Sequence, residues 1–175
     1  MRLRLVYILF SFLCFGCNEP APPQKKLSEL EVQESLIRAN QKLSKNELAD
    51  IEAYILKNSL QMEKTGTGLR FSISGEGKGK YAETGMKATV KYKISLLNGR
   101  VCYSSDSTGF EQFEVDNDQV ESGLHEGIKR MKVGNKAKFI LPSHLAHGLI
   151  GKEDKIPAHA PIIYDIELLE LNKWS

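Results

Sequence analysis

The amino-acid sequence predicts an α+β fold, with one short helix between strands of a mostly antiparallel sheet and a helical segment before them. Apolar and polar residues alternate through residues 69–73 and 90–96, as they do in half-buried strands. Asn98-Gly99 follows the second run after one residue and is a strong hairpin signal. A helical pattern then precedes two further strand patterns, over residues 122–131, 136–141 and 162–171.

Length and charge limit the possible classes of protein. The chain has 175 residues, which is room for one ordinary domain and an appendage. It holds 24 basic and 22 acidic residues, and loss of Arg2 and Arg4 with an N-terminal signal leaves it close to neutral. This balance gives no electrostatic footprint for nucleic acid, so no nucleic-acid partner is expected.

The first 16 residues have the pattern of a signal peptide. Arg2 and Arg4 precede an almost unbroken apolar run, Leu5 to Phe15, which is too short to span a bilayer comfortably. Cleavage is therefore favoured over an uncleaved anchor. Gly16 and Cys17 resemble the end of a bacterial lipobox, in which a small residue precedes the cysteine that receives lipid. A plain cleavage site is the alternative.

Residues 17–26 are polar and rich in proline, which is typical of an extended tether. Lipid on Cys17 would anchor this tether to a membrane of the cell envelope. The periplasm-facing side of the outer membrane is expected, because Asn18-Glu19 lacks an inner-membrane retention aspartate beside Cys17. Cys102 is then the remaining cysteine, so no internal disulfide is expected.

Residues 27–64 are predicted to form a helical segment. Ser28 with Glu31 and Ser44 with Glu47 each match a capping box, so two successive helices are expected. Both would be amphipathic and would need a partner surface. Either they pack on the following domain, or they mediate formation of a homodimer or contact with client proteins.

Residues 65–175 contain a series of short motifs. They are residues 85–92, Asn98-Gly99, Ser104-Ser105, residues 123–128, 131–134, 140–142 and 145–148, Ile156-Pro157 and residues 164–169. In order and spacing they resemble the FKBP family of peptidyl-prolyl cis–trans isomerases. The resemblance implies an FKBP-like antiparallel sheet wrapped on one short helix, isomerase activity and no cofactor. With the helical N-terminus and lipid signal, the chain further resembles FKBP-type lipoproteins associated with gliding motility.

The reaction that this resemblance implies is rotation about the peptide bond before proline. Resonance makes that bond partly double and sets a barrier of about 18–20 kcal/mol. The twisted transition state has lost the resonance and is less polar than the planar amide. A water-poor cleft therefore favours the transition state over the ground state. Prolyl segments of exported proteins are the expected partners.

By their positions in the motifs, five residues are expected to line an apolar proline-binding cleft. They are Tyr92, Val120, Leu124, Ile156 and Tyr164. Phe113 falls near the aromatic residues of the family's sheet and joins the candidate site. Without the resemblance, core residues of the sheet would be the better interpretation of five of them, since most apolar residues belong to the core: Tyr92, Phe113, Leu124, Ile156 and Tyr164.

Three candidate site residues depart from the family pattern. Tyr103 stands in place of an aspartate, His147 in place of a tyrosine and Glu121 in place of an isoleucine. An imidazole can still donate a hydrogen bond, and the backbone amide of Glu121 is kept, but its charge now borders the cleft. Modest isomerase activity is expected. The alternative is a catalytically reduced binding module or holdase chaperone in an envelope assembly.

Other chemistries fit the sequence less well. His144 and His147 lie three residues apart, but no acidic or cysteine partner follows at ligand spacing, so no metal site is expected. The glycines of residues 75–79 are not followed by the start of a helix, which favours a turn over a phosphate-binding loop.

Overall fold

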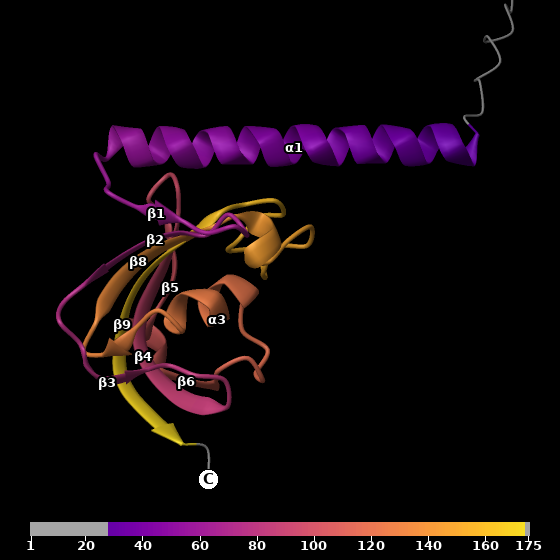
Figure 1. Ribbon diagram of the computed structural model, residues 1–175. Coiled ribbons are helices and arrows are strands. Elements are labelled where there is room, and N and C mark those ends of the chain that lie inside the picture. The colour runs from indigo at the N-terminus through magenta and orange to yellow at the C-terminus, as the bar shows by residue number, and fades with distance from the viewer. Residues whose placement is uncertain (1–27, 174–175) are drawn as a thin grey trace, which may run out of the picture. The chain divides into compact units, whose positions relative to one another are not determined.

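The computed structural model describes residues 28–173 and divides the chain into two compact units, Met1–Leu36 and Ile37–Ser175. The predicted signal peptide, the lipidation site Cys17 and the tether lie outside the described residues. The helices are α1 (Glu29–Lys57), α2 (Ser105–Thr108), α3 (Ser122–Ile128) and the 3-10 helix η1 (Ser143–Leu145). The strands are β1 (Glu63–Lys64), β2 (Arg70–Ser74), β3 (Lys78–Tyr81), β4 (Met86–Leu96), β5 (Val101–Ser104), β6 (Glu111–Glu114), β7 (Lys132–Val133), β8 (Lys136–Leu141) and β9 (Ile162–Lys173) (Figure 1).

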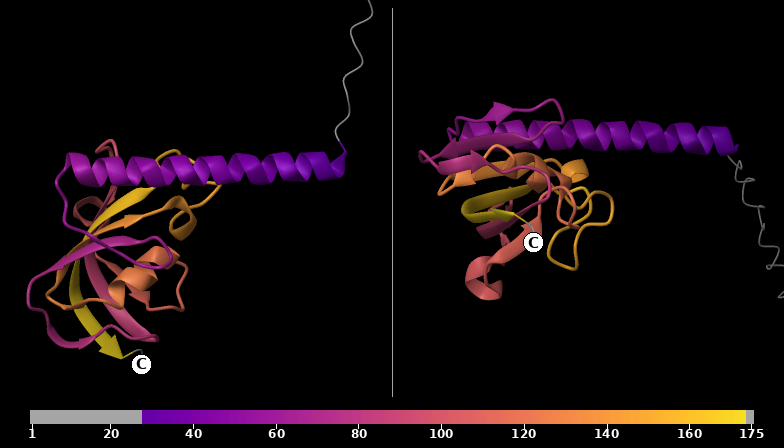
Figure 2. Two further views of the ribbon diagram at one scale, coloured as in Figure 1. Left: turned by 45° about the horizontal axis from the view of Figure 1, so that its top comes forward. Right: turned by 60° about the horizontal axis from the view of Figure 1, so that its bottom comes forward.

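One antiparallel sheet forms the body of the second unit. Its strand order is β1-β2-β8-β9-β4-β5, with β6 also paired to β4, and β3 and β7 form a separate pair. The long strands β4 and β9 pair from Met86 opposite Lys173 to Leu96 opposite Ile162. The sheet curves around α3, as two further views also show (Figures 1 and 2). The predicted α+β fold, an antiparallel sheet wrapped on one short helix, is confirmed.

The alternating pattern of β4 gives the sheet an inner and an outer face. Val90, Tyr92 and Ile94 are buried in the core, whereas Lys91 and Lys93 between them are exposed. Successive side chains of a strand point to opposite faces, so the period of two in the sequence sets this division. The hairpin expected at Asn98-Gly99 joins β4 to β5, and Gly99 adopts a φ of +86° there.

Two glycines allow α3 to lie close against the inner face of the sheet. A Cβ atom at Gly123 would lie 2.6 Å from Leu141 Cγ, and one at Gly127 would lie 2.6 Å from Phe139 Cε2. Both contacts are to buried side chains of β8, so the helix backbone itself fills the space that a side chain would otherwise take. The helix ends at Ile128, earlier than the predicted residue 131.

The segment before the sheet forms one continuous helix, α1, instead of the two helices expected. The first capping box is confirmed: Ser28 N–H donates to Glu31 Oε2 at 2.8 Å, and Glu31 N–H donates to Ser28 Oγ at 3.2 Å. The second, at Ser44 and Glu47, is wrong, because the Glu47 carboxylate binds Ser143 instead. Within residues 28–173, no helix is both long enough and apolar enough to cross a membrane.

The last turns of α1 pack on the outer face of the sheet. Ile51 is fully buried and forms an apolar cluster with Ile140 of β8 and Ile163 of β9. Nearby, the buried Arg70 guanidinium donates to the Glu52 carboxylate. These contacts fix the end of α1 to the domain. Other apolar residues of the helix remain exposed, among them Leu30, Leu36, Ile37 and Leu43.

Candidate functional site

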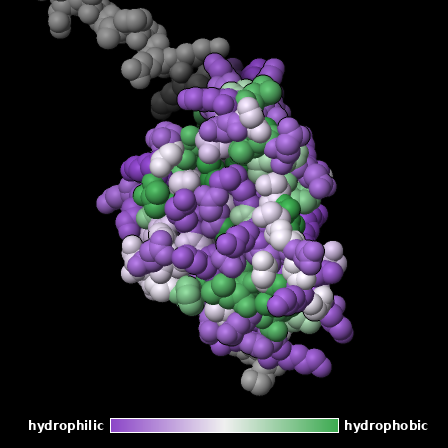
Figure 3. Space-filling view, turned by 90° about the vertical axis from the view of Figure 1, so that its left-hand side faces the viewer, coloured by the Kyte–Doolittle hydropathy of each residue, from purple (hydrophilic) through white to green (hydrophobic). Residues whose placement is uncertain are grey.

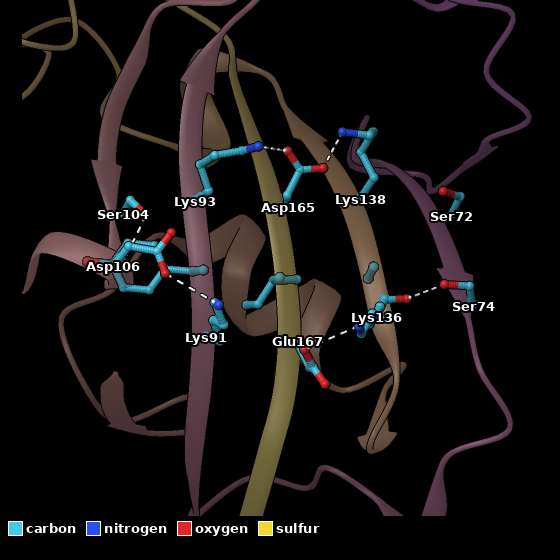
Figure 4. Close-up of a pocket in the computed structure, with 13 residues that line it drawn as sticks. Ser72, Ser74, Lys91, Lys93, Ser104, Asp106, Lys136, Lys138, Asp165 and Glu167 are labelled. Atoms are coloured by element: carbon cyan, nitrogen blue, oxygen red, sulfur yellow. Dashed lines mark hydrogen bonds and ion pairs between the residues drawn. The ribbon is translucent and has the colours of Figure 1, made fainter. Parts of the chain in front are cut away.

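The outer face of the sheet carries a hollow of about 490 Å³ between β2, β8, β9 and β4. Hydrophilic side chains cover much of this side of the molecule (Figure 3). Lysines and carboxylates within the hollow pair with one another: Lys91 with Asp106, Lys93 and Lys138 with Asp165, and Lys136 with Glu167 (Figure 4). Exposed ion pairs of this kind contribute little energy. This hollow is a polar surface of paired charges and not an apolar cleft.

A second hollow, of about 360 Å³, includes inner-face residues of β4 and β9 and is called the α3 cavity here. It is lined by Tyr92 and Ile94 of β4, Tyr103 of β5, Glu111 of β6, Gln119, Val120 and Glu121 before α3, Ala146 and His147 after η1, Lys152, and Tyr164 of β9. Side chains from distant parts of the sequence therefore meet in one place. The cavity combines tyrosine rings with carboxylates, one imidazole and one ammonium group.

The register of the two central strands places the main aromatic wall. Tyr164 of β9 lies opposite Ile94 of β4, and Tyr92 is two residues before Ile94 on the same face. The rings of Tyr92 and Tyr164 are 6.4 Å apart between centroids and tilted by 46°. Tilted aromatic pairs at this separation attract one another. Tyr92 is also held by a contact of 3.1 Å between its hydroxyl and Thr108 Oγ1.

A buried cluster of polar groups forms one end of the α3 cavity. Glu121 is 8% exposed, and its Oε2 accepts a hydrogen bond of 2.7 Å from the Tyr164 hydroxyl. His147 Nε2 lies 2.8 Å from the other carboxylate oxygen of Glu121, yet without the alignment of a hydrogen bond. The Tyr164 hydroxyl thus stabilises a charge that would otherwise be costly to bury.

Burial governs the protonation of this cluster. Burial, followed by the Glu121 charge, raises the pKa of Tyr164 well above its ordinary range, so the phenol stays a donor. Burial lowers the pKa of His147, an effect that Glu121 opposes and Lys152 reinforces. The imidazole of His147 is therefore biased toward its neutral form, which has one donor and one acceptor nitrogen. The pKa of Glu111 is raised by burial and by repulsion from Glu121.

Tyr103 forms a second wall, held by the segment around residue 153. Its hydroxyl donates to Glu153 Oε2 at 2.9 Å, and Lys155 Nζ lies 4.6 Å from the ring centroid. Loss of hydration and the Glu153 charge raise the pKa of Tyr103 to about 12. The ring therefore remains neutral at ordinary pH and its hydroxyl is already engaged.

The structure brings most of the predicted site residues together and leaves the rest in the core. Those that line the α3 cavity are Tyr92, Tyr103, Val120, Glu121, His147 and Tyr164. Phe113, Leu124 and Ile156 are at most 1% exposed, belong to the core and do not line it. Phe113 instead packs edge-on against His125, with centroids 5.8 Å apart.

Several lining residues were not predicted from the sequence. Ile94 could have been found, because it shares the inward face of β4 with Tyr92. Gln119 and Ala146 are chain neighbours of predicted residues. Glu111 and Lys152 could not have been predicted, since no motif or periodic pattern in the sequence links them to the other lining residues.

Comparison with known proteins gives the family. A family model described as FKBP-type peptidyl-prolyl cis-trans isomerase matches residues 78–169, more than half of the chain. The probable FKBP-type isomerase FkpA of Neisseria meningitidis serogroup B is 32% identical over 69% of this chain and 44% of its own length. FkpA of Escherichia coli K12 is 26% identical over 91% of this chain and 63% of its own length. The chain thus spans about half to two thirds of these relatives.

Solved structures agree with this match. The crystal structure of FkpA from Escherichia coli superposes with a TM-score of 0.63 at 29% identity, over 85% of this chain and 75% of the other. The match extends beyond residues 78–169, because it covers 85% of the chain. Sequence motifs, sheet topology and both comparisons therefore lead to one conclusion: the chain belongs to the FKBP-type peptidyl-prolyl cis-trans isomerase family.

Proposed function

We propose that this protein is a peptidyl-prolyl cis–trans isomerase that assists the folding of exported proteins, and that the α3 cavity binds the prolyl segment. The observation that carries the proposal is that Tyr92, Val120 and Tyr164 line one cavity. These are positions at which the family resemblance implies contact with proline. The names of the relatives, which describe isomerases, support the same activity.

The apolar part of the cavity wall, formed by the tyrosine rings and Val120, would act on the prolyl amide. A planar prolyl amide carries partial negative charge on its carbonyl oxygen, and water stabilises that charge. Tyrosine rings and Val120 would displace this water and so disfavour the planar amide relative to the twisted one. No acid, base or metal is needed for this step, because no covalent bond is made or broken.

Two groups are available to orient a bound peptide. His147 Nε2 is buried at the cavity and has no hydrogen-bond partner among residues 28–173. Nε2 lies 2.8 Å from Glu121 Oε1, so the imidazole would have to turn away from that carboxylate before it donated to a substrate carbonyl. The backbone N–H of Glu121 also has no partner in the described part of the chain. Both groups belong to the polar end of the cavity, where they would fix the position of a bound peptide.

A second candidate function follows from the carboxylates. Glu121 and Glu111 both line the α3 cavity and make its wall more polar, which favours the planar, polar amide. Activity is therefore expected to be modest. The same observation favours a catalytically reduced binding module or holdase chaperone, which would serve an envelope assembly such as one for gliding motility.

One NMR titration distinguishes the two candidate functions. A short proline-containing peptide gives separate cis and trans signals, because uncatalysed exchange takes tens of seconds or longer. Catalytic amounts of the protein are expected to produce exchange between those signals and to shift the signals of Val120 and His147. Shifts without exchange would favour the binding module. No shift and no exchange would contradict both.

We also propose export and lipid anchoring at the cell envelope. Arg2, Arg4 and the apolar run after them support export, and Gly16-Cys17 supports lipid attachment. Each buried CH₂ contributes about 0.8 kcal/mol, and a single acyl chain gives only marginal, reversible membrane binding. Stable anchoring therefore needs two or more acyl chains. Mass spectrometry of the mature protein decides the point: an unmodified Cys17, or a chain that still begins at Met1, would contradict it.

We propose further that α1 pairs with α1 of a second copy of the chain. Leu36 and Leu43 are 58% and 43% exposed, and residues seven apart lie on one side of a helix. Glutamate at both positions is expected to convert a dimer into a monomer, as measured by sedimentation. Leu56 is 78% exposed on the opposite side of α1, so Leu56→Glu is a matched control. A wild-type monomer at all concentrations would refute the pairing.

A further inference from the structure

Glu47 connects α1 to the turn that leads into the α3 cavity. Its side chain is 9% exposed, although it lies in the middle of a long helix with many exposed residues. Oε2 accepts a hydrogen bond of 2.7 Å from Ser143 Oγ, and Oε1 accepts one from the Ser143 backbone N–H. Both carboxylate oxygens therefore bind one residue, at the start of the segment 143–148, called the η1 turn here.

Ser143 holds both ends of the η1 turn. Pro142, which precedes it, supplies no side-chain hydrogen bond to the free N–H groups of the 3-10 helix. Glu47 satisfies the first of them from another element, as a capping residue would. The Ser143 carbonyl then accepts hydrogen bonds from Ala146 N–H at 3.0 Å and from Gly148 N–H at 2.7 Å. Four hydrogen bonds of the turn and its anchor on α1 therefore involve this one residue.

The η1 turn forms part of the cavity wall. Ala146 and His147 line the α3 cavity. Ser122 Oγ donates to the Leu145 carbonyl at 3.4 Å, so the turn also contacts the first residue of α3. His147 Nε2 lies 2.8 Å from Glu121 Oε1 without hydrogen-bond alignment. A small rotation of the turn would therefore change where the imidazole nitrogen points.

We propose that Glu47 is a positioning residue, which sets the place of His147 in the α3 cavity through its two hydrogen bonds to Ser143. The proposal rests on the proposed function of that cavity. It makes α1 part of the functional site and not only an appendage. A partner that moves α1 would change the cavity without touching it.

Glu52 provides a matched control on the same helix. It too is a glutamate of α1 that binds the sheet domain, through the guanidinium of Arg70 on β2. Neither residue of that pair forms a hydrogen bond with the η1 turn. Glu47→Ala and Glu52→Ala should therefore both lower stability, whereas only the first should alter the cavity.

Two NMR readouts test the positioning role directly. The first is the chemical shift of the His147 ring proton between the two nitrogens. The second is the rate of hydrogen exchange at the amides of Ala146 and Gly148, which donate to Ser143. Glu47→Ala is expected to move the His147 signal and to speed exchange at both amides. Glu52→Ala is expected to leave both readouts at their wild-type values.

Kinetics give the functional readout. Glu47→Ala is expected to raise KM for a prolyl peptide about tenfold with a smaller change in kcat, because displaced contacts weaken peptide binding. Glu47→Gln keeps one acceptor oxygen and should fall between the wild type and Glu47→Ala. If Glu47→Ala does not fold, the same measurements on Glu47→Gln test the positioning role.

Failure of the positioning role and failure of the proposed function would give different results. Unchanged readouts in the Glu47 variants, or equal changes in Glu52→Ala, would overturn the positioning role. A wild-type protein without isomerase activity would refute the proposed function instead, and the two NMR readouts would still decide whether Glu47 positions His147.

Discussion

Replacement of Tyr164 by alanine is expected to lower the free energy of unfolding by about 4 kcal/mol and to remove nearly all isomerase activity. Tyr164 is 1% exposed and is among the largest fully buried side chains. Its loss would leave a void next to Tyr92 and open one wall of the α3 cavity. Denaturant unfolding measures the first effect. The cis–trans exchange rate of a prolyl peptide, measured well below the midpoint of unfolding, gives the second.

Tyr164→Phe separates the contribution of the aromatic ring from that of the hydroxyl. The hydroxyl donates to Glu121, so its removal leaves a buried carboxylate with one donor fewer and costs roughly 1–3 kcal/mol. The ring wall is kept, and most of the exchange rate should be kept with it. If phenylalanine and alanine abolish activity equally, the hydroxyl and not the aromatic wall is what the reaction requires.

The fold could be predicted wherever a local pattern decides the structure. The period of two in residues 90–96 fixed the inner face of β4, and Asn98-Gly99 located the turn after it. The capping box at Ser44 and Glu47 failed for a physical reason. The partner of Glu47 is Ser143, 96 residues away in sequence, and a local motif carries no information about it.

The site was predicted in part for a related reason. A motif gives the position of a residue in a family, but the packing of neighbours decides whether its side chain faces the cavity or the core. Leu124, a residue of α3, is fully buried. Arginine at that position would place a charge in the core and unfold the domain, so it could not report on the cavity. Val120, four residues earlier, lines the cavity instead.

Two valines allow the cavity to be blocked without damage to the core. Val120 is partly buried and lines the α3 cavity, whereas Val101 on β5 is 54% exposed and does not. Arginine at either position can keep its charge in water by extending outward. The two variants add the same group to the same protein, and only one adds it where a prolyl segment is proposed to bind.

The rate of cis–trans exchange of a prolyl peptide with wild-type, Val120→Arg and Val101→Arg protein is therefore the decisive measurement. The wild type and Val101→Arg should accelerate exchange within about a factor of two of each other, because surface substitutions are usually near neutral. Val120→Arg should bring the rate down to the uncatalysed value. Exchange as fast with Val120→Arg as with the wild type would show that the prolyl bond turns somewhere else on the molecule.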